Sequence, residues 1–435
     1  MEKNNFRKIA AITLFESAVQ WYCFLLYGTA AGTVFHKVFF SQTGNGTTAL
    51  ILSYMSFAIG YIAGPFGAIF FGHIGDRKGR KVTMYASLLM MGISTSIIGI
   101  LPSAASVGVG VVIVLQLMRL AQCFGRGGTW GGGILMAYEN VPENKRSFYA
   151  AIPQIGLPIG FGLSSILIAV PTLLLPEDIF FTWGWRIPFL AAIILTLIVI
   201  RQKGEMMETE DYKKAQAKLE AEEAEGKKHK VGFIPMVKGY WKTLLLGCGT
   251  RWVDGTFYNI FIVWILSYCI NWLGMPLIQT YIITIIACIF KIPFTLFGGW
   301  CAQKLGNTRT FVIGALASAV LSIPTLKVIE LSKGNLAITI IGIVLGWSIA
   351  YNLIWAVISS LWSSYFETEV RYSGISFVYH VPSFLVAGMV PTICTLLINY
   401  GKGDTIYVGI YSTVVALISA ACALALKARH DRGEK

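Results

Sequence analysis

Long apolar segments recur along the whole chain and limit what it can fold into. Of its 435 residues, 55% are hydrophobic and only 13% are charged, whereas a soluble protein carries about 25% charged residues. An apolar run of about 20 residues is long enough to cross a membrane as a helix. Barrel strands alternate in polarity and would not give continuous apolar runs. The sequence therefore predicts an all-α integral membrane protein.

We predict twelve transmembrane helices. They cover approximately residues 9–33, 48–71, 83–102, 108–137, 147–171, 182–201, 243–268, 277–301, 310–327, 335–357, 372–398 and 405–427. The stretch 202–242 differs because it is rich in Glu and Lys. We interpret it as a charged cytoplasmic linker between an N-terminal six-helix half, residues 1–201, and a C-terminal six-helix half, residues 243–435.

The formal net charge of +13 is unevenly distributed. Most Lys and Arg residues fall in the N-terminal tail, alternate loops, the linker and the C-terminal tail, while the opposite loops hold Lys37, Lys327, Lys333 and Lys402. This asymmetry predicts that both termini are in the cytoplasm and that the protein lies in the cell membrane. It also explains the net charge without a nucleic-acid partner. The eight cysteines lie singly in apolar segments, so no disulfide framework and no metal site is predicted, and no cofactor.

A basic, glycine-rich stretch at 72–81 separates two of the apolar segments, and we expect a tight loop there. A second, degenerate copy follows about half a chain later. The matching positions are Gly72 and Gly299, Asp76 and Gln303, Arg77 and Lys304, and Gly79 and Gly306. This spacing indicates two tandem copies of one membrane unit, and parallel repeats of this kind build alternating-access transporters.

Other motifs strengthen this interpretation. They are Arg119–Phe124 followed by Gly127–Gly132, then Glu139, Pro142 and Arg146, Trp183–Phe189, and Phe366 with Arg371–Gly374. With the 72–81 loop, they resemble the major facilitator superfamily, and within it the metabolite:proton symporter group. The resemblance spans nearly the whole chain and implies two pseudo-symmetric six-helix halves, a small-molecule substrate and a monomer in the lipid bilayer. It also implies that a conformational gate is formed by Gly72, Asp76, Arg77, Gly79 and Arg80.

The chain departs from the pattern of that group at its acidic positions. The group's Glu-x-Tyr-Asp motif in helix one is replaced by 20–23, Gln-Trp-Tyr-Cys. The usual Glu before the helix-four Trp is Thr129, an Arg common before the helix-two Pro is Gly64, and the second loop Asp is Gln303. A coupled proton needs a protonatable group near the cavity. The departures therefore leave proton symport, substrate exchange and uniport open, together with the identity of any coupling ion.

Ionisable residues inside the predicted spans are functional candidates, because each costs a few kcal/mol or more in the membrane unless it is paired or hydrated. Arg119 and Arg126 are seven residues apart and thus lie on nearly the same helix face. Both are candidate ligands for a carboxylate or phosphate. The alternatives are a structural clamp on backbone carbonyls for Arg119 and a snorkelling position at the membrane edge for Arg126.

Five further residues are candidates for coupling. Glu16 lies one helical turn before Gln20, where the acidic motif of the group is missing. It either replaces the missing carboxylate in proton coupling or is an interfacial residue. Arg251 and Asp254 are three residues apart on helix seven, and Asp254 could pair with Arg251 or with Lys291 of helix eight. Such a pair either opens during transport or is a fixed internal salt bridge. His380 is the fifth candidate, since a histidine can titrate near neutral pH.

The leading hypothesis is a transporter of a small organic anion of the mono- or dicarboxylate type. Its candidate substrate-binding residues are Arg119, Arg126, Gln20, Tyr22, Trp130, Tyr258 and Trp355. The four aromatic residues among them also fit a carrier of zwitterionic or quaternary ammonium solutes, which is the alternative. A transport-dead membrane sensor is a remote alternative. The sequence contains no nucleophile motif or phosphate loop, so no enzymatic activity is predicted.

Overall fold

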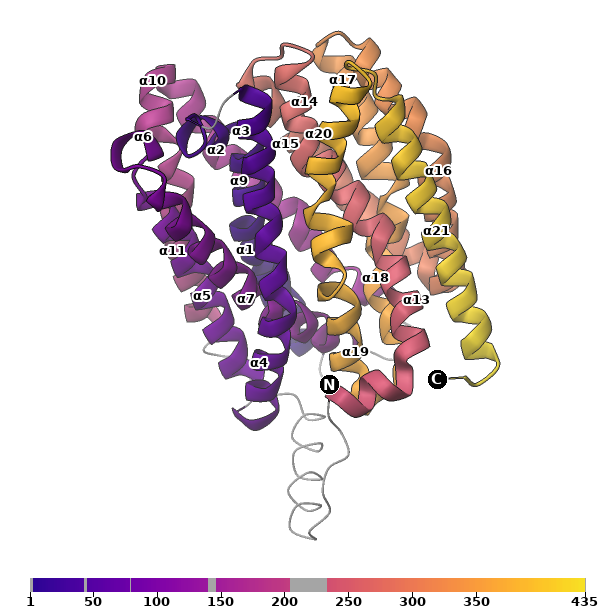
Figure 1. Ribbon diagram of the computed structural model, residues 1–435. Helices are drawn as coiled ribbons and strands as arrows, with labels where there is room; N and C mark the ends of the chain where they lie inside the picture. The colour runs from indigo at the N-terminus through magenta and orange to yellow at the C-terminus, as the bar shows by residue number, and fades with distance from the viewer. Residues whose placement is uncertain (1–2, 43–44, 79, 140–145, 204–232, 435) are drawn as a thin grey trace.

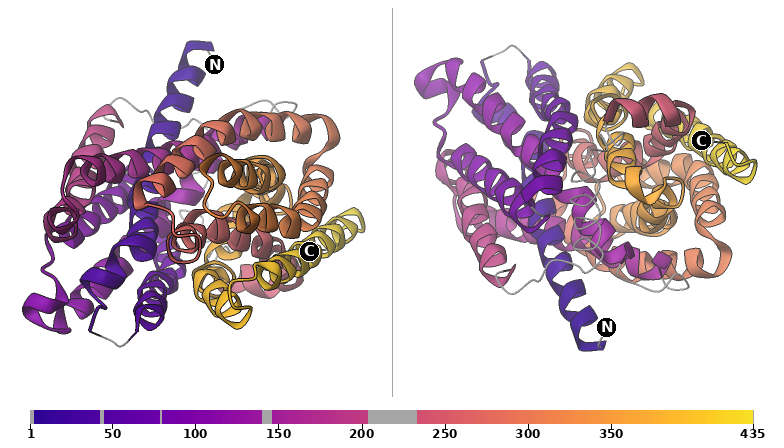
Figure 2. Two further views of the ribbon diagram at one scale, coloured as in Figure 1. Left: turned by 90° about the horizontal axis from the view of Figure 1, so that it is seen from above. Right: turned by 90° about the horizontal axis from the view of Figure 1, so that it is seen from below.

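The computed structural model describes residues 3–42, 45–78, 80–139, 146–203 and 233–434, and it places no β-strand among them. These residues form two helical bundles side by side, the N-terminal one in indigo to magenta and the C-terminal one in salmon to yellow (Figure 1, Figure 2). Both termini lie at the same end of the molecule (Figure 1). We call this end the termini end and the opposite one the far end.

The helices follow one another with short connections. The first bundle contains α1 (Lys3–Thr33), α2 (Phe35–Val38), α3 (Gly46–Ile59), η1 (Gly60–Ile62), α4 (Ala63–Lys78), α5 (Arg80–Ile100), α6 (Ala104–Val107), α7 (Gly110–Glu139), α8 (Arg146–Ala150), η3 (Pro153–Ile155), α9 (Gly156–Leu174), α10 (Glu177–Ile179), η4 (Phe180–Gly184) and α11 (Arg186–Lys203). The second contains α13 (Phe233–Asn259), η5 (Ile260–Trp264), α14 (Ile265–Asn271), α15 (Leu277–Leu305), α16 (Asn307–Leu331), α17 (Leu336–Ile343), η6 (Val344–Ala350), α18 (Asn352–Ser363), α19 (Thr368–His380), η7 (Phe384–Gly388), α20 (Val390–Tyr400) and α21 (Ile406–Asp431).

The predicted number of membrane spans agrees with this fold. In the described part of the chain, nine helical segments are long and apolar enough to cross a membrane, and a tenth span is the pair Ser373–His380 and Phe384–Tyr400, bent by 40°. Helices α1 and α7, of 31 and 30 residues, complete the twelve. Both are long enough to span the hydrocarbon core, although their polar and charged residues lower their hydropathy.

Large apolar side chains cover the outer surface of both bundles. Leu174, Val320 and Leu385 are 76%, 72% and 67% exposed, respectively. Water-exposed apolar surfaces of this extent are rare in soluble proteins and mark contact with a membrane or a partner. Polar side chains such as Arg119 and Lys291 are instead fully buried. This inversion of polarity is the one expected of a protein whose solvent is lipid.

Glycines bring α4 and α7 close together. A Cβ atom added to Gly67 would lie 1.9 Å from the carbonyl oxygen of Phe124, and one added to Gly127 would lie 2.4 Å from the amide nitrogen of Ala68. Any side chain at either position would push the helices apart, as in other small-residue contacts between membrane helices. The glycine run 127–133 does not end the helix, because α7 is continuous from Gly110 to Glu139.

The stretch 72–81 is also more helical than predicted. Helix α4 continues to Lys78 and α5 begins at Arg80, so the expected loop shrinks to residue 79, which lies outside the described residues. Isolated glycines cost a helix only about 1 kcal/mol each and do not end it here. In the second copy the turn is visible at Gly306, whose φ of +89° favours glycine. Gly79 and the side chains of Asp76, Arg77 and Arg80 are outside the described part, so the gating role of these residues and of Gly72 stays a prediction.

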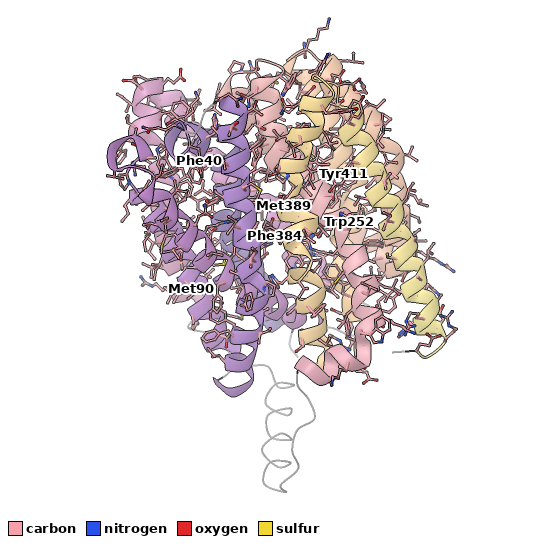
Figure 3. All side chains as sticks on the ribbon, in the orientation of Figure 1. Phe40, Met90, Trp252, Phe384, Met389 and Tyr411 are labelled. Atoms are coloured by element: carbon pink, nitrogen blue, oxygen red, sulfur yellow. The ribbon has the colours of Figure 1, made fainter. Side chains whose placement is uncertain are left out.

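Three spans of the second bundle contain a wide π-helical turn near their middle. These turns are η5, η6 and η7. Figure 3 shows Phe384 and Met389 at mid-height on the span that contains η7. A π-turn rotates the residues that follow it and is found frequently at functional sites. Here the turns flank buried polar residues, namely Asn259, Asn352 and His380.

Candidate functional site

The two bundles meet at the centre of the molecule through aromatic side chains. Trp21 of α1 contacts Tyr258 of α13 and Trp355 of α18, with ring centroids 5.7 and 5.4 Å apart. The Trp355 indole nitrogen donates a hydrogen bond to the carbonyl of Gln154 at 3.0 Å. The side-chain amide of Gln154 donates in return to the carbonyl of Trp355 at 3.2 Å. Two of the predicted aromatic residues, Tyr258 and Trp355, therefore do lie together between the bundles.

Arg126 lies at this interface. Its guanidinium is 3% exposed and donates to the hydroxyl of Tyr379, a residue of α19 in the other bundle, at 2.5 Å. Its carbon Cζ lies 3.8 Å from the ring centroid of Phe24 and 4.6 Å from that of Trp21. The Arg126 Nε has no hydrogen-bond partner among the described residues. Arg126 is therefore a buried cation between the bundles, and the snorkelling alternative does not fit this position.

Arg119 faces the interior of the first bundle instead. It is fully buried among the rings of Phe24, Tyr27 and Phe57, with Cζ 4.4 to 4.7 Å from their centroids. It donates to the side chain of Gln122, which in turn donates to the carbonyl of Cys23 at 2.9 Å. Arg119 thus ties α7 to α1 through an amide. This resembles the structural clamp that was the alternative for this residue, with Gln122 as an intermediate.

An acidic group balances one cation on the second bundle's side. Arg251 and Asp254 of α13 form an ion pair, and both side chains are 2% exposed. The Tyr351 hydroxyl donates to the other carboxylate oxygen of Asp254. The Arg251 guanidinium also lies over the ring of Tyr379, 4.4 Å from its centroid. Of the two partners that the sequence left open for Asp254, the structure selects Arg251.

Lys291 of α15 is buried without a carboxylate at hydrogen-bond distance among the described residues. Its ammonium donates to the side-chain oxygen of Asn352 at 2.9 Å and to the carbonyl of Trp347 at 3.3 Å. It also lies 4.6 and 4.4 Å from the ring centroids of Trp347 and Tyr351. Because Tyr351 binds Asp254, Lys291 and the ion pair share one aromatic neighbour.

His380 occupies the space beside Gly64. A Cβ atom at position 64 would lie 2.8 Å from the His380 Nδ1, so the arginine expected there from the family pattern would displace this imidazole. His380 is 4% exposed and stacks edge-on with Tyr379, with centroids 5.0 Å apart. Its Nε2 has no hydrogen-bond partner among the residues that the structure describes. In this structure the imidazole thus occupies the space that a side chain at position 64 would enter.

The remaining predicted residues do not all join this cluster. Tyr22 points into the first bundle, where its hydroxyl donates to the carbonyl of Pro188 at 2.5 Å. Gln20 is 3% exposed, and its amide nitrogen has no hydrogen-bond partner among the described residues. Glu16 is 2% exposed and lies within electrostatic range of Tyr85. The backbone of Trp130 belongs to α7, but its side chain is outside the described part.

Cross-bundle hydrogen bonds close the centre toward the termini end. The Ser147 hydroxyl donates to the side-chain oxygen of Asn307 at 2.9 Å. The backbone N–H of Phe148 donates to the side-chain oxygen of Gln303 at 3.3 Å. Gln303 is the residue that replaces the second-copy aspartate. Its neutral amide thus accepts a backbone hydrogen bond from the other bundle at the end of α15.

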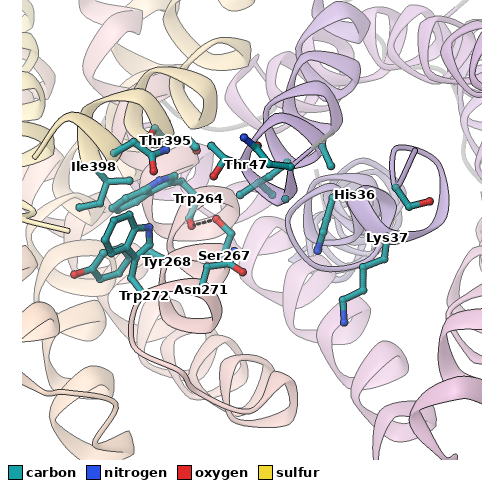
Figure 4. A pocket seen from close by; sticks show the side chains of 16 residues that line it. His36, Lys37, Thr47, Trp264, Ser267, Tyr268, Asn271, Trp272, Thr395 and Ile398 are labelled. Carbon is teal, nitrogen blue, oxygen red and sulfur yellow. Dashed lines mark hydrogen bonds between the residues drawn. The ribbon is translucent and has the colours of Figure 1, made fainter. Parts of the chain in front are cut away.

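Toward the far end, hydrogen bonds between hydroxyl groups cross from one bundle to the other. The Tyr54 hydroxyl donates to Ser267 at 2.6 Å, and that of Tyr281 donates to Thr33 at 3.2 Å. Above the first pair lies a cavity of about 600 Å³ between the bundles, lined by His36 and Lys37 on one side and by Trp264, Tyr268 and Asn271 on the other (Figure 4). Burial and the nearby Lys37 lower the pKa of His36 to about 4, so its ring is neutral at pH 7.

A cavity above a closed, polar and aromatic centre between two six-helix bundles is the arrangement expected of a carrier. The family model for the Major Facilitator Superfamily matches residues 10–391. The chain belongs to this superfamily. Two relatives from Escherichia coli K12 are similar over almost the whole chain. The inner membrane metabolite transport protein YhjE is 33% identical, covering 98% of this chain and 96% of its own, and the shikimate transporter is 32% identical, covering 96% and 94%.

More distant members are named for other substrates. The proline/betaine transporter of Salmonella typhimurium is 27% identical, covering 99% of this chain and 85% of its own. Among solved structures, a D-xylose-proton symporter is 16% identical with a TM-score of 0.70, and each chain is covered to 96%. At such identity the structural match supports the superfamily fold alone. The predicted superfamily and fold are thus confirmed, and the family and relatives are transporters.

Sequence reasoning missed several residues of the centre. Tyr379 contacts both Arg126 and Arg251 yet belongs to no motif. Asn352 and Gln154 join helices by amide hydrogen bonds but are ordinary polar residues in the sequence. A polar side chain within an apolar segment was the available signal.

Proposed function

We propose that this protein carries a small organic anion of the mono- or dicarboxylate type across the cytoplasmic membrane by alternating access. The observation that carries the proposal is Arg126, a buried guanidinium between the two bundles with an unused donor. A guanidinium binds a carboxylate through two parallel hydrogen bonds. Trp21, Tyr258 and Trp355 supply an apolar wall beside it.

The balance of charge supports an anion. The described residues buried inside the two bundles include four cations, namely Arg119, Arg126, Arg251 and Lys291, against two carboxylates, Glu16 and Asp254, of which Asp254 is bound to Arg251. Buried charges without counter-charges are costly, and an arriving anion offsets that cost. A relative of similar length carries shikimate, according to its name, and shikimate is a small carboxylate.

The alternative is a zwitterionic or quaternary ammonium solute. It is favoured by the aromatic cluster of Trp21, Tyr258 and Trp355, since the faces of such rings attract cations. A 27% identical relative is named a proline/betaine transporter. The cations around the cluster argue for the anion.

Thermal unfolding of the purified protein with a ligand panel distinguishes these classes. We expect shikimate, benzoate or succinate to raise the melting temperature and glycine betaine and proline to leave it unchanged, because a ligand that binds only the folded state stabilises it. Stabilisation by betaine alone would overturn the anion proposal in favour of the alternative. Shikimate methyl ester is the matched control, since it keeps the ring and loses the charge.

Transport would proceed by rocking of the N-terminal bundle, 1–201, against the C-terminal bundle, 243–435. The two hydrogen bonds at each end of the centre must break in turn, those of Tyr54 and Tyr281 at the far end and those of Gln303 and Asn307 at the termini end. We propose that the termini end is cytoplasmic, as the distribution of Lys and Arg favours. The undescribed gate residues near 72–80 would then act on the cytoplasmic side.

Proton coupling is tested at Glu16, the buried carboxylate of α1. If Glu16 carries the coupled proton, Glu16→Gln should abolish uptake of shikimate driven by a pH gradient and leave shikimate exchange at its original rate, because glutamine cannot take up a proton. Both rates are measured in proteoliposomes. If Glu16→Gln abolishes both uptake and exchange, or neither, Glu16 is not the coupling residue. The remaining candidates are then Asp254, Arg251, Lys291 and His380.

A further inference from the structure

Tyr379 lies between cationic groups of the two bundles. Its hydroxyl accepts a hydrogen bond from Arg126 of the first bundle at 2.5 Å, while its ring lies under Arg251 of its own bundle at 4.4 Å. The ring also contacts Trp362, with centroids 6.2 Å apart, and His380. Tyr379 is 1% exposed. The neutral phenol hydroxyl of Tyr379 is thus the group to which Arg126 donates a hydrogen bond across the bundle interface.

Closing a carrier around Arg126 requires the guanidinium to lose its water. Burying a charged donor without an acceptor is costly. The Phe24 and Trp21 rings offset part of this cost through cation–π contacts, but they accept no conventional hydrogen bond. The Tyr379 hydroxyl is the one hydrogen-bond acceptor that the described residues offer to Arg126. Closure of the centre therefore depends on this hydroxyl unless another acceptor arrives.

We propose that Tyr379 takes the place of the substrate's carboxylate when the carrier returns empty. In the loaded carrier, the carboxylate accepts from Arg126 and the hydroxyl is not needed. In the empty carrier, the hydroxyl satisfies Arg126 and lets the bundles close. Tyr379 is then the positioning residue that permits net transport, since a carrier that cannot close when empty can only exchange substrate for substrate. This inference rests on the proposed anion site.

The variant Tyr379→Phe isolates the hydroxyl, because phenylalanine keeps the ring under Arg251. Its matched control is Tyr281→Phe, which removes another cross-bundle hydroxyl bond, to Thr33, that involves no cation. We expect Tyr379→Phe to lower net shikimate uptake at least about tenfold, the effect of losing one hydrogen bond to a charged group, with exchange within about twofold of wild type. The control should change net uptake and exchange by the same factor.

A second measurement needs no substrate. Spin labels at Ser41 and Asn399, exposed positions on the two sides of the far-end cavity, report the separation of the bundles. Cys248 and Cys422, the partly exposed cysteines, are first replaced by serine. Without ligand, Tyr379→Phe should raise the ratio of long to short distances about tenfold. Tyr281→Phe is measured in the same background.

The outcomes separate the two proposals. An unchanged distance distribution in Tyr379→Phe, or a shift no larger than that of Tyr281→Phe, overturns the role of Tyr379. Equal losses of net uptake and exchange also overturn it and make Tyr379 a substrate ligand or a structural residue. Absence of shikimate flux in the wild type speaks against the proposed substrate, while the distance measurement still decides whether Tyr379 controls closure.

Discussion

Replacing Asp254 with alanine should lower the free energy of unfolding by about 3–5 kcal/mol, the cost of leaving a buried charge without its partner. Asp254 is the carboxylate partner of Arg251, and both side chains are 2% exposed. The substitution also leaves the Tyr351 hydroxyl without its acceptor. We expect a clearly lower melting temperature in detergent and loss of transport.

A double variant separates stability from transport at this pair. Arg251→Met with Asp254→Leu replaces the two ions by apolar side chains, which often restores or exceeds the original stability. If the ion pair takes part in transport, the double variant is stable but inactive; if it is structural, activity returns with stability. The surface pair Lys427–Asp431 is the control, because Asp431→Ala should cost only about 0–1 kcal/mol. A single variant Asp254→Ala as stable as wild type would contradict the buried-pair interpretation.

The second large effect is expected at Arg126. Arg126→Met should weaken shikimate binding about 10- to 100-fold, since hydrogen bonds to charged groups contribute about 1.5–3 kcal/mol. The protein should still fold, because methionine can keep the contacts with Trp21 and Phe24 and leaves no buried carboxylate unpaired. Binding is measured by the ligand-induced shift of the melting temperature and by calorimetry.

Two further variants make this result interpretable. Arg126→Lys keeps the charge but not the forked donor geometry, so its affinity should lie between those of wild type and Arg126→Met. Arg309→Met removes an arginine that is exposed on α16 and should bind as wild type does. Unchanged affinity in Arg126→Met would remove this residue from the substrate site.

Most of the architecture followed from the sequence. Continuous apolar segments predicted the all-α membrane fold, because the hydrocarbon core demands long helices whatever their packing. The related positions around Gly79 and Gly306 predicted tandem units. The local error at 72–81 arose because glycines suggested a loop where helix α4 continues to Lys78. Local composition is a weak guide to where a helix ends.

The site depended on packing that no local pattern contains. Arg119 and Arg126 are on nearly the same helix face, yet one lies inside the first bundle and the other faces Tyr379, 253 residues away. Seven residues advance a helix by about 10.5 Å, enough to bring the second arginine opposite different neighbours.

The sequence by itself determined that cations, carboxylates and aromatic rings would be carried into the membrane, because their placement within apolar segments leaves them no other position. Only the tertiary structure decided which of them meet. Asp254 pairs with Arg251 and not with Lys291, and His380 lies beside Gly64. The physical reason is that a helix sequence specifies which face a side chain occupies, whereas the partner on that face is set by how twelve helices pack around one another.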